Sequence, residues 1–100
     1  MPLLPRIVGA DPNPFNSSTT IEVFIPAVGA SPASVMISRY NILGRKVGAA
    51  YNGELEYGSH RIEWNARSIN GHSLTSGIYF ARLSVWGHEF GPVAKLILQK

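Results

Sequence analysis

The sequence predicts an all-β domain with two stacked layers of strands. Its 100 residues are 45% hydrophobic and only 15% charged, which suits a single domain with one core. Gly, Pro, Asn or Ser interrupt the chain about every 8 to 15 residues, a spacing typical of sandwiches and barrels. Cys is absent, so the fold has no disulfide. We therefore expect an immunoglobulin-like β-sandwich of about seven antiparallel strands, with a five-stranded barrel as the alternative.

The first segment with clear local structure is a turn followed by a strand. Residues 12–18 contain two prolines, which cannot donate to a sheet, and Asn and Ser side chains that stabilise turns. Residues 19–25 then alternate, with Ile21, Val23 and Ile25 on one face. This pattern predicts a strand with one buried face.

A second strand is expected over residues 34–42, where Val35 and Ile37 share a face. Arg39 follows in the same phase and should also point inward. A charged side chain there requires either a bulge or a guanidinium that reaches outward along its apolar stem. Residues 41–44 (NILG) predict the turn that ends this strand.

The middle of the chain gives weaker signals. Residues 45–47 form a short polar run that suits a sheet edge. Residues 48–59 are interrupted by Gly and Asn, and we expect a loop there. Residues 60–65 alternate cleanly again, which predicts a strand with Ile62 and Trp64 buried.

The last third of the chain predicts a turn and two strands. Asn70-Gly71 is the strongest short turn signal in the sequence. Residues 77–85 have apolar side chains on both faces, so this strand should be central. The chain should reverse at residues 86–88 and end inside a strand that begins at residue 93.

Charge and motifs exclude several classes of function. The net charge is +3, but the basic residues form no run, so no nucleic-acid interface is expected. No apolar stretch approaches the roughly 18 residues of a membrane helix. His60, His72 and His88 lack metal-ligand spacing, and the carboxylates form no evident pair. We therefore predict no enzyme active site, no cofactor and no metal site.

Two aromatic residues support an alternative function. Trp86 is expected at a hairpin tip, where an exposed indole could stack on a sugar, and Phe90 could extend that patch. On this interpretation the chain would be a carbohydrate-binding accessory module of a secreted hydrolase. Weak polysaccharide contact would follow.

Several segments resemble a known family by their order and spacing. They are residues 13–21 (NPFNSSTTI), 40–47 (YNILGRKV) and 76–83 (SGIYFARL), with Trp64-Asn65 before Asn70-Gly71 and the closing residues 95–100 (KLILQK). Residues 11–100 thus resemble the type A C-terminal sorting domain of the type IX secretion system. That domain is similar to the immunoglobulin-like domain of the flagellar hook-capping protein.

The resemblance implies a non-catalytic sorting domain of a larger protein that is secreted or held at the cell surface. Its partners would be the outer-membrane secretion machinery and a covalently linked upstream cargo, with residues 1–10 as a strand or linker from the preceding region. The alternative of a structural domain in a surface or flagellar assembly stays open. The implied recognition residues are Asn13, Pro14, Phe15 and Asn16 in the first turn, Gly44 in the next reversal, Gly77 and Tyr79 in the central strand, and Lys95, Leu96, Leu98 and Lys100 at the end.

Two positions depart from the family pattern. Arg39 stands where an apolar residue is usual, and Pro92 interrupts the approach to the last strand. We nevertheless expect the last strand to be the element that a receptor grasps, through the hydrogen-bonding groups of an exposed edge.

Overall fold

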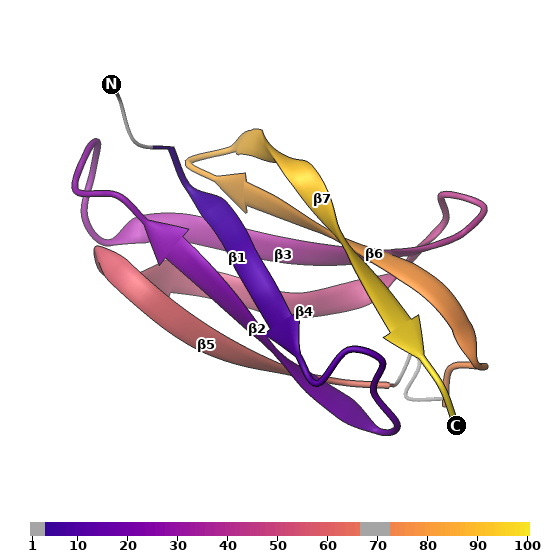
Figure 1. Ribbon diagram of the computed structural model, residues 1–100. Coiled ribbons are helices and arrows are strands. Elements are labelled where there is room, and N and C mark those ends of the chain that lie inside the picture. Colours follow the sequence, from indigo (N-terminus) through magenta and orange to yellow (C-terminus); the bar gives the residue numbers. More distant parts are fainter. Residues whose placement is uncertain (1–3, 67–72) are drawn as a thin grey trace.

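Two antiparallel sheets packed face to face make up the part of the chain that the computed structural model describes, residues 4–66 and 73–100 (Figure 1). Seven strands lie in this part, as the sequence predicts. They are β1 (Arg6–Asp11), β2 (Ser18–Ile25), β3 (Ala33–Asn41), β4 (Lys46–Leu55), β5 (Gly58–Asn65), β6 (Gly77–Val85) and β7 (His88–Leu98). The predicted immunoglobulin-like sandwich is confirmed.

The strands are divided between the sheets in a fixed order. The first sheet has the order β1-β2-β5, and the second has the order β4-β3-β6-β7. β6 is central, as its two apolar faces predict, while β4 and β7 are the edges of the second sheet. In Figure 1, β1 and β7 run side by side where the two sheets meet. None of the described residues forms a helix long and apolar enough to cross a membrane.

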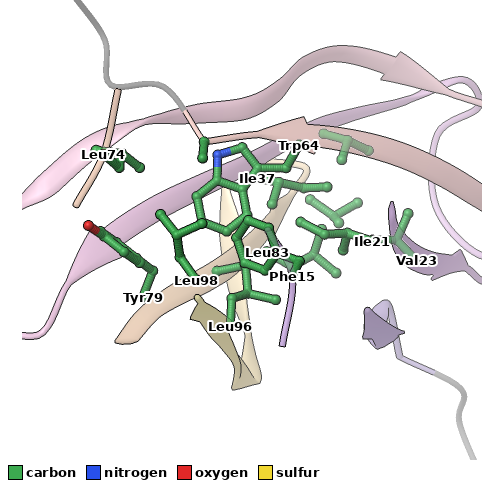
Figure 2. Packing of buried hydrophobic residues seen from close by; sticks show 14 of the residues in the cluster. Phe15, Ile21, Val23, Ile37, Trp64, Leu74, Tyr79, Leu83, Leu96 and Leu98 are labelled. Atoms are coloured by element: carbon green, nitrogen blue, oxygen red, sulfur yellow. The ribbon is translucent and has the colours of Figure 1, made fainter. Parts of the chain in front are cut away.

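The core lies between the sheets and follows the alternation of the sequence. Ile21, Val23 and Ile25 on β2 are fully buried, as are Leu96 and Leu98 on β7. Figure 2 shows the Trp64 ring in the middle of this cluster, with residues of both sheets around it. Trp64 is only 1% exposed, whereas Ile62, which we also expected to be buried, is half-buried.

Arg39 points into this core, as its phase predicts. It is 5% exposed, its guanidinium lies 4.9 Å above the Trp64 ring, and Nη1 donates to the carbonyl of Asn65 at 2.9 Å. The register of β3 against β4 shifts on either side of Arg39, so a bulge accompanies the inward side chain. Burial lowers the pKa of Arg39 to about 10.

Two expectations about the strands are wrong. Residues 48–59 are not a loop, because β4 runs to Leu55 and β5 starts at Gly58. The sequence of β4 contains Gly and Asn and shows little alternation of apolar residues, so it resembles a loop. It still forms a strand at the sheet edge, where backbone pairing with β3 on one side is sufficient. The last strand starts at His88 rather than residue 93 and ends at Leu98, so the final two residues lie beyond it. The predicted Asn70-Gly71 turn lies outside the described residues.

Candidate functional site

The first turn of the chain lies along the outer edge of β7. The side chain of Asn13 makes two hydrogen bonds to the β7 backbone: Nδ2 donates to the carbonyl of Lys95, and Oδ1 accepts from the amide of Ile97, both at 2.9 Å. One amide side chain therefore mimics the donor and acceptor of a neighbouring strand. Eighty-two residues separate Asn13 from Lys95, so the contact joins the two ends of the fold.

Phe15 continues the same pairing with its backbone. Its amide donates to the carbonyl of Ile97 at 2.9 Å, and its carbonyl accepts from the amide of Gln99 at 2.8 Å, in a parallel bridge. The side chain turns inward, where the ring is 2% exposed and lies 5.1 Å from Trp64 (Figure 2). We call Asn13, Phe15 and the backbone of residues 95–99 the clasp.

The turn that carries the clasp is held by a residue that the sequence did not single out. The hydroxyl of Thr19 donates to the carbonyl of Pro12 at 2.7 Å, and Thr19 is 1% exposed. Pro14 and Asn16 are exposed between these anchored positions. The alternation that buries Ile21 and Val23 also places Thr19 on the inner face of β2, so its burial could have been predicted, although its bond to Pro12 could not.

On its other side, β7 is held by the predicted residues of β6. Gly77 pairs with Leu98, and Tyr79 pairs with Leu96. The Tyr79 ring lies 6.0 Å from Trp64, and its hydroxyl donates to the carbonyl of Thr75 at 2.7 Å. The end of β7 is therefore hydrogen-bonded on both edges, to β6 on one side and to the clasp on the other.

Two predicted residues lie at the margins of this group. The amide of Lys100 donates to the hydroxyl of Ser76 at 3.1 Å, which ties the tail to the start of β6. Gly44 lies in the β3–β4 turn, two strands away from β7 in the second sheet. Its φ of +82° explains the glycine, and its amide donates to the carbonyl of Asn41 at 2.9 Å. The structure therefore brings Asn13, Phe15, Lys95, Leu96, Leu98, Gly77 and Tyr79 together, and leaves Gly44 apart.

This arrangement corrects the expected exposed edge. The backbone groups of β7 between residues 95 and 99 are paired with β6 on one side and with the clasp on the other. Further toward its start, Pro92 has no N–H to offer. A receptor strand cannot extend the sheet along the end of β7 while the clasp is closed.

Trp86 is not the exposed ring that the sequence suggested. It is half-buried, its indole N–H donates to the carbonyl of Ala30 at 3.0 Å, and the ring covers Gly29. Phe90 is half-buried against the core. The hydroxyl of Tyr57 also donates to the carbonyl of Gly29, at 2.9 Å. Trp86 therefore holds the β2–β3 loop and is not presented to a sugar.

The chemistry of this region is that of a binding surface. Its polar contacts are hydrogen bonds of the backbone, of the Asn13 amide and of hydroxyl groups, and they hold the segments together. Within residues 4–66 and 73–100, no three His, Asp or Glu side chains gather where they could hold a metal ion.

Comparisons with known proteins agree with this geometry. The sequence model of the secretion system C-terminal sorting domain matches residues 11–99. Among solved structures, the chain is similar to dimeric latent PorU from Porphyromonas gingivalis, with a TM-score of 0.74 and 22% identity over 99% of this chain. The chain covers only 10% of that PorU chain, and this likeness shows the fold. No curated protein matches the sequence. The family match spans nearly the whole chain, from the turn before the clasp to the residue after β7, and the chain belongs to the secretion system C-terminal sorting domain family.

Proposed function

We propose that this domain is the non-catalytic sorting signal of a larger protein, which it carries across the outer membrane through the type IX machinery to the cell surface. A sorting domain of this family marks its protein for secretion. The observation that carries the proposal is the match over residues 11–99, which includes the clasp and strands β2 to β7.

The proposed partners are the outer-membrane machinery and the upstream cargo. β1 includes residues of the segment that we expected to join the cargo, and it pairs with β2 in the first sheet. A covalent connection through residues 1–10 would therefore attach the cargo directly to a strand of the fold. The proposed recognition element is β7 as the clasp holds it, because β7 and the clasp contain most of the residues that the family resemblance implies.

A secretion assay tests the proposal. A periplasmic reporter fused ahead of residue 1 is expected to reach the medium or the cell surface in a bacterium that has the type IX pathway. The same reporter without the domain should stay in the periplasm, as should a fusion that carries Leu98→Asp, because a charge at this fully buried position destroys the core. Retention of the wild-type fusion in the periplasm would contradict the proposal.

The alternatives have less support. The carbohydrate-binding interpretation depended on an exposed Trp86, and the ring is engaged with the β2–β3 loop. A structural role in a surface or flagellar assembly, and the likeness to the hook-capping protein, stay predictions.

A further inference from the structure

Since the clasp occupies the backbone edge of residues 95–99, a partner that binds this end of β7 must contact the outward side chains of the strand. Leu96 and Leu98 point into the core, so the side chains between them point outward from the second sheet. Lys95 is exposed and Ile97 is half-buried on that face. The surface around these two residues then decides what the strand can bind.

One row of side chains crosses the whole outer face at this level. Strand pairing places Tyr40 opposite both Lys46 and Phe80, and Phe80 opposite Lys95. Directly paired residues project from the same side of a sheet. The row is Lys46 on β4, Tyr40 on β3, Phe80 on β6 and Lys95 on β7. Two aromatic rings therefore lie between two cations.

Two further apolar side chains lie at the border of this face, Ile42 in the β3–β4 turn and Val93 on the edge strand β7. Together with Tyr40 and Phe80 they line a groove. Ile42 is 68% exposed and Val93 is 39% exposed, although neither is required to cover the core. Aromatic and aliphatic side chains at the centre with charges at the margin are typical of protein interfaces.

Among the described residues, this face carries three cations, Lys46, Arg82 and Lys95, and two carboxylates, Glu54 and Glu89. The guanidinium of Arg82 lies 5.5 Å above the Tyr40 ring and pairs with Glu89 at 3.1 Å. Lys46 and Lys95 add two cations to this face, and Arg45 in the adjoining turn is exposed. The outer face of the first sheet is different because its charges alternate in sign, with Glu22 opposite Arg61 and Glu63 two residues away.

We infer that the outer face of β4-β3-β6-β7 binds an acidic protein surface, in which carboxylates meet Lys46 and Lys95 while an apolar side chain enters the groove beside Tyr40 and Phe80. This inference rests on the proposed function and specifies the surface by which the secretion machinery recognises the domain. A second copy docked face to face would oppose cation to cation. A long anionic polymer is disfavoured because the carboxylates of Glu54 and Glu89 lie on the same face and interrupt a continuous stripe of cations.

Binding of the full chain to the detergent-solubilised outer-membrane translocation complex of a type IX bacterium tests the inference. Wild-type domain should bind more weakly as salt rises from about 50 to 300 mM. Reversal of both lysines, Lys46→Glu with Lys95→Glu, should weaken binding at least about tenfold. Phe80→Thr should also weaken it, with less dependence on salt. Lys95→Glu alone should already weaken binding, whereas Arg61→Glu on the opposite sheet, which changes the net charge by the same amount, is its matched control and should bind as wild type.

The same variants separate this inference from the proposed function. If wild-type domain directs export and binds the complex while the double lysine reversal does both equally well, the outer face is not the recognition surface, although the sorting role stands. Equal weakening by Arg61→Glu would also overturn the inference, since net charge alone would then explain binding. Two further results would overturn it: lysine-dependent binding to phosphatidylglycerol vesicles without binding to the complex, or lysine-dependent self-association in sedimentation. Circular dichroism melting confirms that each variant folds.

Discussion

Arg39 is a buried cation whose cost is set by its surroundings. The guanidinium contacts Trp64 and the carbonyl of Asn65, but within the described residues its Nε has no hydrogen-bond partner. Because burial depresses the folded-state pKa to about 10, Arg39 stays charged below this pH, and the folded state there carries the full cost of burying the charge. That cost is relieved only as the pH rises through this value.

Arg39→Met is expected to leave the free energy of unfolding unchanged or to raise it by up to about 2 kcal/mol, since Met keeps the apolar stem on Trp64 and removes the buried charge. Arg39→Ala, which also removes the stem, should lower it by about 2 to 4 kcal/mol through the cavity left behind. Urea denaturation at pH 7 measures both. A loss above about 1 kcal/mol in Arg39→Met would show that the cation is a net stabiliser.

Gly48 is the residue that makes room for this guanidinium. It pairs with Arg39, has a φ of +154°, and a Cβ added there would overlap Nη2 of Arg39. Gly48→Ala should therefore lower the free energy of unfolding by about 2 kcal/mol or more. Gly91→Ala is the control, because open space surrounds that position. In an Arg39→Met background, Gly48→Ala should lower the free energy of unfolding by less, because the guanidinium that the new Cβ would overlap is gone. If the effects of the two substitutions simply add, this overlap is not the cause of the loss.

At the scale of elements, the clasp depends on Asn13. Asn13→Ala removes two hydrogen bonds to β7, and we expect the free energy of unfolding to fall by about 1 to 2 kcal/mol. Hydrogen exchange should show faster exchange of the Ile97 amide. Asn52→Ala, at an exposed position of β4, is the matched control. The same exchange rates in both variants would mean that the clasp adds nothing in solution.

β7 contributes side chains to the core and forms one edge of the second sheet, so its removal should unfold the whole domain. A chain that ends before Lys95 lacks Leu96 and Leu98, which are fully buried, and lacks every β7 partner of Asn13 and Phe15. We expect no cooperative thermal transition and no export of a fused reporter. Removal of Lys100 alone should keep both. A truncated chain that still melts cooperatively would disprove a structural role for β7.

The elements differ in how well sequence predicts them. β2 and β6 were predicted because β-branched and aromatic residues alternate in them, and that pattern reports burial. The start of β4 and its edge position were predicted from residues 45–47, but its length was missed because the Gly48 to Gly53 stretch does not reveal backbone pairing with β3. β7 was shortened because Pro92 reads as a breaker, although an edge strand tolerates it.

The features that the sequence did not predict depend on contacts between distant segments of the chain. The inward direction of Arg39 follows from strand phase, but its Trp64 and Gly48 neighbours come from other strands. Trp86 was misjudged since its partner, Ala30, is 56 residues away. For the candidate site, the motif residues were predicted and their joining into a clasp was not.

For the whole molecule, one core should give one unfolding transition. Trp64 contacts Phe15 from the first turn and Tyr79 from the second sheet, so neither sheet can lose its packing alone. In a Trp86→Phe variant, Trp64 fluorescence and far-ultraviolet circular dichroism should report the same midpoint. Separate midpoints would mean that the sheets unfold independently.

The parallel course of β1 and β7 also determines how the domain bears mechanical load. A cargo pulling on the chain ahead of β1, against a receptor that holds the end of β7, would slide two neighbouring segments in opposite directions. The bonds of Asn13 and Phe15 to residues 95–99 lie across that sliding direction. These hydrogen bonds would be loaded in parallel and would have to break together. The domain would therefore stay folded under a force that could open a hairpin, in which the bonds break one after another.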